Sequence, residues 1–150
     1  MSIRKKLNAN AVPIQMPIIS SDDIFVGVVD LIGMKSIHWP PRRENDSVSR
    51  TAPMPKVELL KPSNPLYSDA LKKRKGLLES LAEEDDEFLE FYCAQGDTII
   101  EETGPTNEDI HFIIKHIKKA CVSGKIVPVV CGASLRGVGV QPVLDSILVY

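Results

Sequence analysis

The glycine-rich stretch from Gly132 to Gly139 comes closest, by residue type and spacing, to a nucleotide-binding motif. It lies between an apolar run and an apolar stripe with helical spacing, which is where a phosphate-binding loop would lie. The stretch has the first half of the pattern G-x-x-x-x-G-K-[ST]. Val138 and Gly139 stand where that pattern needs the lysine that reaches phosphate and the hydroxyl that holds magnesium. We therefore interpret the stretch as a tight turn between a strand and a helix.

Two further patterns, a short acidic motif and a pair of histidines, do not indicate a reaction centre. Asp30 to Gly33 matches the D-x-x-G of guanine-nucleotide sites, but no phosphate-binding loop precedes it, so a chance match is the better interpretation. His111 and His116 are five positions apart, which places them about 140° apart on a helix. They cannot bind one metal ion from one face. We therefore predict neither a catalytic residue nor a metal site in this chain.

Four consecutive cations could form a binding surface for another protein. They are Lys72, Lys73, Arg74 and Lys75, and an acidic run at 83–87 follows them. Such runs are usually solvated helix faces and helix-end charges. The alternative is a cationic docking surface that attracts an acidic partner protein. The residues alone leave both interpretations open.

The composition is that of a folded globular protein and excludes several classes. Of the 150 residues 43% are hydrophobic and 25% charged, which is close to the globular average. A net charge of −2 and 5% aromatic residues argue against direct DNA binding. Three widely spaced cysteines fit neither a disulfide framework nor a zinc site. No apolar run is long enough for a membrane span or a signal core, so we expect an intracellular protein without membrane contact.

The first half of the chain is expected to contain strands and a long loop. Residues 12–39 are rich in β-branched side chains without a helical period, which predicts two or three strands, antiparallel to one another. Residues 40–65 contain six of the eleven prolines and are predicted as a loop. Within that loop, the alternating segment from Lys56 to Leu60 could still pair as a strand.

The second half is expected to be mainly helical. Apolar residues recur every three to four positions over 66–123, which predicts three helices. Acidic residues at 85–87 favour the start of the second, and Thr106 with Asp109 predicts a capping box for the third. A short strand at 126–131 and a last helix ending at Tyr150 follow. The absence of a capping glycine or proline suggests that this helix is cut at its end. The fold class is α+β (α/β): a small sheet of antiparallel strands, then three helices, then a terminal strand, loop and helix.

Several segments resemble elongation factor G in order and spacing. They are residues 7–18 (LNANAVPIQMPI), 25–31 (FVGVVDL), 34–35 with Trp39, 78–79, 85–88 (DDEF), 129–132 (VVCG) and 139–145 (GVQPVLD). Together they cover nearly the whole chain.

The resemblance implies a division of the chain. Residues 1–11 would be the end of a helix of a host GTP-binding domain, and 12–125 would be a subdomain inserted into that domain. Residues 126–150 would return to it as the last strand, guanine-site loop and helix of a P-loop GTPase fold. The strand at 126–131 and the apolar stripe of the last helix would then pack on host strands that are missing from this chain. The phosphate loop, switch regions and magnesium ligands would then lie upstream of Met1. GTP and magnesium would be cofactors of the parent protein, whereas this chain alone would hold no cofactor and would be catalytically inactive.

The resemblance also carries over one site. Gly132, Ala133, Ser134 and Leu135 would form the guanine-base loop, with backbone donors turned toward the base. The family usually reads C-G-S-A here, and this chain inverts the last pair to Ala133-Ser134. Ile19 also stands where the family usually has glycine. Such departures favour an organellar, mitochondrial member over a bacterial one.

The function implied is that of a translational GTPase acting on the ribosome in GTP-driven translocation or in ribosome recycling. The expected partners are the ribosome, the ribosomal stalk protein and the rest of the GTP-binding domain. Lys72, Lys73, Arg74 and Lys75 would then be the stalk-docking residues. The alternative is a free-standing protein-interaction module without nucleotide chemistry.

Overall fold

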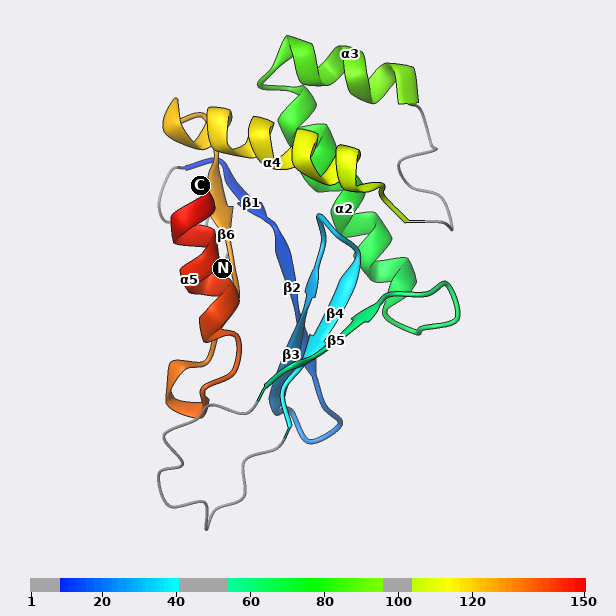
Figure 1. Cartoon of the computed structure of the whole chain (residues 1–150), viewed down its shortest axis with the longest axis vertical. Helices are drawn as coiled ribbons and strands as arrows, with labels where there is room; N and C mark the ends of the chain where they lie inside the picture. Colours follow the sequence, from blue (N-terminus) through cyan, green and yellow to red (C-terminus); the bar gives the residue numbers. More distant parts are fainter. Residues whose placement is uncertain (1–8, 41–53, 96–103) are drawn as a thin grey trace.

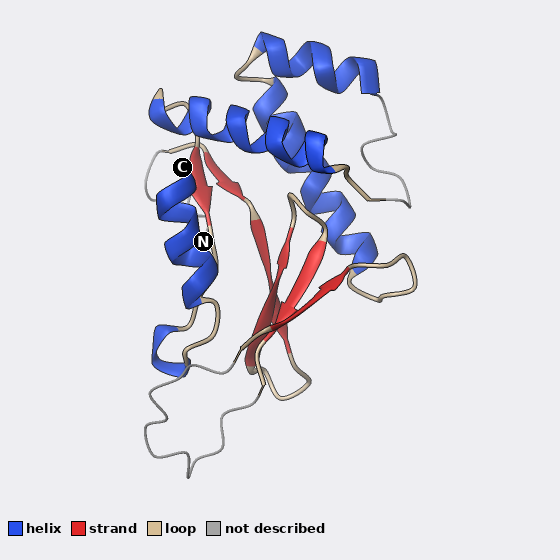
Figure 2. Ribbon diagram, viewed as in Figure 1, coloured by secondary structure: helices blue, strands red, loops and turns tan. Residues whose placement is uncertain are grey.

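The computed structural model describes residues 9–40, 54–95 and 104–150 (Figure 1). A four-stranded sheet lies beneath a group of three helices, and a separate pair of strands lies next to the last helix (Figure 2). This arrangement confirms the predicted fold class. Within the described ranges, no helix has both the length and the apolar character needed to cross a membrane.

The sheet is antiparallel throughout, as the sequence predicts. Its strands are β2 (Gln15–Ile19), β3 (Phe25–Asp30), β4 (Lys35–His38) and β5 (Lys56–Leu59), in that order across the sheet. β5 confirms that part of the proline-rich segment pairs as a strand, since Val57 lies opposite Ile37 of β4. Residues 41–53 of the predicted loop lie outside the described ranges.

Three helices follow the sheet, and the second and third of them begin where the capping residues predict. They are α2 (Tyr67–Ala82), α3 (Asp86–Gln95) and α4 (Asn107–Val122). Asp85 caps α3, because its Oδ1 accepts a hydrogen bond from the N–H of Glu87 at 3.1 Å. At α4, the N–H of Asp109 donates to Thr106 Oγ1 at 3.2 Å, and the N–H of Thr106 donates to Asp109 Oδ2 at 2.9 Å. This is the predicted capping box.

The main core lies where the helices meet the sheet. The apolar stripe of α2 and that of α4 are buried together with alternate residues of β2 and β3. The fully or almost fully buried members include Leu77, Leu78, Leu81, Ile113, Ile117, Phe88, Met16 and Val29. The apolar face of the helices therefore packs against the apolar face of the sheet, so that both faces are buried.

A second, two-stranded sheet joins distant parts of the chain. β1 (Ala11–Pro13) pairs in parallel with β6 (Val127–Val129), with Ala11 opposite Val127. The expectation of a helix over 1–11 is wrong at Ala11, because this residue is in a strand; residues 1–8 lie outside the described part. The strand predicted at 126–131 is shorter than expected. It pairs with β1 of this chain, so the expectation that its partner strands are missing from the chain is wrong for one of its edges.

The last helix, α5 (Val140–Val149), lies beside β6 (Figure 1), and several of its apolar side chains are exposed. Ile147 is 71% and Leu148 82% exposed, and no residue of the helix is fully buried. A helix with an apolar stripe normally buries that stripe. The expectation that this stripe lacks its packing partner therefore agrees with the structure.

Candidate functional site

The glycine-rich loop between β6 and α5 is a compact turn, as predicted. Ser134–Arg136 form a single 3-10 turn (η2), and the residues on either side of it, Ala133 and Val138, pair through N–H to carbonyl bonds of 2.8 and 3.3 Å. Gly139 has φ 76°, and a Cβ there would lie 2.7 Å from the carbonyl oxygen of Cys131. Glycine is therefore required at this position.

The tip of this loop presents backbone donors. Ser134 and Leu135 are exposed, and Leu135 projects almost entirely into solvent. Among the described residues, no acceptor lies within hydrogen-bonding distance of either N–H group, whereas the N–H of Ala133 is bonded to Val138. Ser134 and Leu135, two of the residues expected to face a guanine base, thus offer unbonded N–H groups at the tip of the loop.

A side chain from the four-stranded sheet holds the base of the loop. Gln15, at the start of β2, accepts a hydrogen bond from the N–H of Cys131 through Oε1 at 3.2 Å. Burial raises the pKa of the Cys131 thiol, so the thiol stays protonated and unreactive at neutral pH. The loop is therefore fixed to the sheet by a direct contact.

The predicted cationic run divides between the surface and the core. Lys72, Lys73 and Lys75 are exposed on α2, but Arg74 is fully buried. Its place among the docking residues is therefore wrong. Position 74 is four after Ala70 and three before Leu77, so it falls on the apolar stripe of the helix. That spacing is the signal that would have placed Arg74 inside.

The buried Arg74 ties α2 to the turn between β3 and β4. Its Nη1 donates to the carbonyl oxygen of Leu31 at 2.5 Å and to that of Ile32. Burial lowers the pKa of Arg74 to about 10, and the charge of Asp30 acts against this shift. The guanidinium remains protonated at neutral pH and serves as a structural cation.

Asp30, the first residue of the D-x-x-G pattern, shapes that turn. Its carboxylate accepts the N–H of Ile32 at 3.0 Å and that of Gly33 at 3.1 Å. Burial raises the pKa of Asp30, while the two backbone bonds and Arg74 lower it. The pattern thus has a structural explanation, because it positions the carbonyl groups that Arg74 binds.

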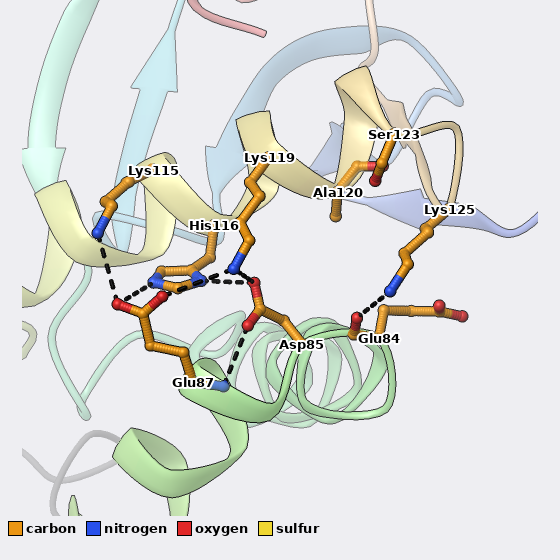
Figure 3. Close-up of polar contacts among 9 residues, drawn as sticks. All are labelled: Glu84, Asp85, Glu87, Lys115, His116, Lys119, Ala120, Ser123 and Lys125. Atoms are coloured by element: carbon orange, nitrogen blue, oxygen red, sulfur yellow. Dashed lines mark hydrogen bonds and ion pairs between the residues drawn. The ribbon is translucent and has the colours of Figure 1, made fainter.

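A polar network that sequence reasoning missed joins α3 to α4 (Figure 3). His116 is buried, with Nδ1 2.9 Å from Asp85 Oδ2, and Lys119 Nζ lies 2.8 Å from the same oxygen. Burial opposes ionisation of Asp85, but the hydrogen bonds from Lys119 and His116 outweigh it and hold the pKa of this carboxyl well below its usual range. The available signal was the position of His116, three residues after Ile113 on the apolar stripe.

Comparisons with known proteins identify relatives of the chain. No family model matches it. The elongation factors G of Thermotoga maritima and Thermotoga petrophila are each 39% identical to it over 145 residues, which is 97% of this chain and 18% of each relative. This chain is homologous to elongation factor G. The resemblance inferred from the sequence is thereby confirmed, and the chain spans 18% of the length of these relatives.

The homology to elongation factor G takes in the whole fold. Because it covers 97% of the chain, the β1–β6 pair and α5 belong to the related segment together with the larger sheet and its helices. A solved structure from Thermus thermophilus has the same fold, with a TM-score of 0.66 and 23% identity over 98% of this chain and 18% of that chain.

Proposed function

We propose that this chain is a segment of an elongation factor G-type GTPase that acts on the ribosome, in GTP-driven translocation or in recycling. The supporting observation is 39% identity to elongation factor G over 97% of the chain. GTP and magnesium are cofactors of the parent protein in this proposal. The coding sequence upstream of Met1 tests it, since it should encode an N-K-x-D motif. Absence of that motif would favour a free-standing interaction module.

In this proposal residues 12–125 are a subdomain inserted into the GTP-binding domain, and 126–150 return to that domain. The parallel pairing of Ala11 with Val127 supports the division, because the chain leaves and re-enters one sheet on neighbouring strands. The exposed stripe of α5 gives independent support. In the parent it would pack on the remaining strands of the GTP-binding domain.

The loop of Gly132, Ala133, Ser134 and Leu135 would face the guanine base in the parent. The unbonded N–H groups at its tip support this role, and recognition through backbone groups does not depend on the order of Ala133 and Ser134. One base-facing loop cannot replace a phosphate cradle and magnesium. The chain alone is therefore expected neither to bind guanine nucleotides measurably nor to hydrolyse GTP.

The exposed lysines of α2, namely Lys72, Lys73 and Lys75, would dock the ribosomal stalk protein. We call them the α2 lysine patch. Their exposure supports this role. The charge of Lys72 also remains available to a partner, because Lys72 Nζ lies 3.9 Å from Asp69 Oδ1 and this ion pair is weak. A patch of like charge steers an acidic partner and is screened by salt over about 8–10 Å. The expected binding is weak and sensitive to salt.

A charge reversal tests the α2 lysine patch. The double variant Lys72→Glu, Lys75→Glu should weaken binding of the cognate stalk domain, measured by NMR titration at low salt, and leave the melting temperature nearly unchanged, because exposed charges contribute only about 0–1 kcal/mol to stability. Lys118→Glu, on the exposed side of α4, is the control. Equal stalk binding by the double variant and the control would show that the patch is only a solvated face.

We further propose that the parent acts in mitochondria. The proposal is supported by Ile19 and by the inverted Ala133-Ser134 pair, the departures from the usual family sequence. A fluorescent fusion of the full-length parent should colocalise with a mitochondrial marker. A cytoplasmic distribution would contradict the proposal.

A further inference from the structure

A histidine and two carboxylates meet where α3 begins against α4 (Figure 3). Asp85 caps α3, Glu87 is in its first turn and His116 comes from the third turn of α4. One ligand atom from each lies within 4.8 Å of the other two. Side chains 31 positions apart in the chain therefore converge on one point.

One nitrogen of His116 is buried without a partner. The side chain is 0% exposed, and Nδ1 is held by Asp85. Within the described residues Nε2 has no hydrogen-bond partner, and Glu87 Oε1 lies 3.8 Å from it. That distance is too long for a hydrogen bond. When Nδ1–H donates to Asp85, the Nε2 lone pair faces a carboxylate oxygen across a gap that suits a cation.

The surroundings already attract cations and allow access. Lys119 Nζ lies 3.5 Å from Glu87 Oε2, and Lys115 Nζ lies 3.5 Å from Glu87 Oε1. Both lysines and Glu87 are more than half exposed, so these ion pairs can open at small cost. A hollow of about 380 Å³, lined in part by Asp85, Glu87 and Lys119, opens beside the cluster. A hydrated ion can reach Glu87 through this hollow.

We propose that Zn²⁺ binds in this gap, with His116 Nε2 and the Glu87 carboxylate as protein ligands and water in the remaining positions. Asp85 is the positioning residue, since a carboxylate on the other ring nitrogen fixes the tautomer of a zinc-bound histidine. Zinc bonds to nitrogen and oxygen are about 2.0–2.2 Å long, which places two tetrahedral ligands roughly 3.4 Å apart. Glu87 therefore needs to move by only about half an ångström from its 3.8 Å separation.

The donor set favours zinc over magnesium. Imidazole nitrogen is a ligand for Zn²⁺, whereas Mg²⁺ takes oxygen ligands and keeps much of its water. A zinc ion with only two protein ligands, one imidazole nitrogen and one carboxylate, exchanges with zinc ions in solution. Bound zinc would link α4 to the first turn of α3 and oppose separation of the two helices.

The test is a titration of the native chain with ZnCl₂, observed by NMR at the two imidazole nitrogens of His116. We expect a saturable shift at Nε2, retention of the Nδ1–H, and no change with MgCl₂ at equal concentration. A site-specific signal is needed because the three free cysteines are also potential zinc ligands. Zinc bound at cysteines alone, or a His116 protonated at both nitrogens that does not respond to zinc, would overturn the proposal.

Variants separate a zinc ligand from an ion-pair partner. Glu87→Gln should weaken zinc binding at His116 strongly, and Asp85→Asn should weaken it by about tenfold. Asp85→Asn should also change the tautomer ratio of His116 in zinc-free protein, which a purely structural role in capping would not do. Lys119→Met should tighten binding because it removes a competing cation, whereas Lys118→Met on the same helix should not. If Glu87→Gln and Lys119→Met both leave zinc affinity unchanged, the assignment is wrong.

Discussion

At the scale of single residues, the structure places charged groups inside where a surface was expected. Arg74 belongs to a run of four cations, yet its guanidinium holds the carbonyl groups of Leu31 and Ile32 in the core. The carboxylate of Asp30 shapes the turn that presents those groups. A buried cation bonded to backbone oxygen is more sensitive to substitution than an exposed one, since its loss leaves acceptors unsatisfied.

Truncation of Arg74 should therefore destabilise the chain. Arg74→Ala removes a fully buried side chain and leaves two carbonyl groups without their donor, for a loss of about 3 kcal/mol in the free energy of unfolding. Arg74→Met keeps most of the volume and should lose less. Lys73→Ala, one residue away on the exposed face, should change stability by no more than about 0.5 kcal/mol. Urea unfolding of the three variants gives the comparison, and equal losses for Arg74→Ala and Lys73→Ala would contradict the buried role.

Asp85, at the start of α3, should make the free energy of unfolding depend on pH. Because the folded pKa of Asp85 lies below its unfolded value of about 3.9, the unfolded chain binds the proton more tightly. Its stabilisation is complete above the unfolded pKa and is lost as the pH falls from about 4 toward the folded pKa. The stability difference between the native chain and Asp85→Asn should thus shrink between pH 7 and pH 3 in urea unfolding. Asp86→Asn, the same change at an exposed neighbour, is the control for charge at the helix start.

At the scale of elements, the loop between β6 and α5 depends on two glycines in different ways. Both have a positive φ, 68° at Gly137 and 76° at Gly139. A Cβ at Gly137 would meet nothing within 4 Å, whereas one at Gly139 would lie 2.7 Å from a backbone oxygen. Substitutions at these two positions thus distinguish backbone strain, at Gly137, from a steric clash, at Gly139.

We expect alanine to be tolerated at one of these positions and not at the other. Gly137→Ala should cost about 1 kcal/mol, which is the strain of the left-handed region. Gly139→Ala should cost clearly more and should increase amide hydrogen exchange over residues 132–139. Thermal unfolding and hydrogen exchange measure the two effects. Similar stability of the two variants would mean that the close approach of Gly139 to Cys131 is not maintained in solution.

Local sequence signals predicted the elements well, and long-range pairing could not be predicted from them. The starts of α3 and α4 follow from side chains that bond to N–H groups within three residues, so Asp85, Thr106 and Asp109 carry the information locally. The parallel pairing of β1 with β6 joins residues more than a hundred positions apart, and nothing near Ala11 specifies Val127. The Asp85–His116 contact was missed for the same reason, although the buried position of His116 was available from helical spacing.

At the scale of the whole molecule, the exposed apolar stripe of α5 makes the chain prone to association. Leu144, Ile147 and Leu148 lie on the solvent side of a helix that buries none of its residues. Apolar surface of this kind gains roughly 25 cal/mol for each Å² removed from water. An isolated copy therefore has a driving force for burying the stripe against another surface.

We expect association that increases with protein concentration and is mediated by α5. The double variant Ile147→Lys, Leu148→Glu should shift the sedimentation coefficient to that of a monomer, because charges on the stripe oppose its burial. Leu135→Lys, at the exposed tip of the loop, should leave association unchanged. A native chain that is monomeric at every concentration, or a double variant that still associates, would exclude α5 as the contact.

The side-by-side position of β1 and β6 also bears on how such a segment can be gained, lost or exchanged. The N–H of Val127 donates to the carbonyl oxygen of Asn10 at 2.9 Å, so the two strands lie one strand spacing apart although more than a hundred residues separate them in the chain. Because the strands are parallel, any segment that joins them must cross from the end of β1 back to the start of β6, which takes about a dozen residues or more. We expect the pair to accept intervening segments of very different length, provided that each still makes this crossover.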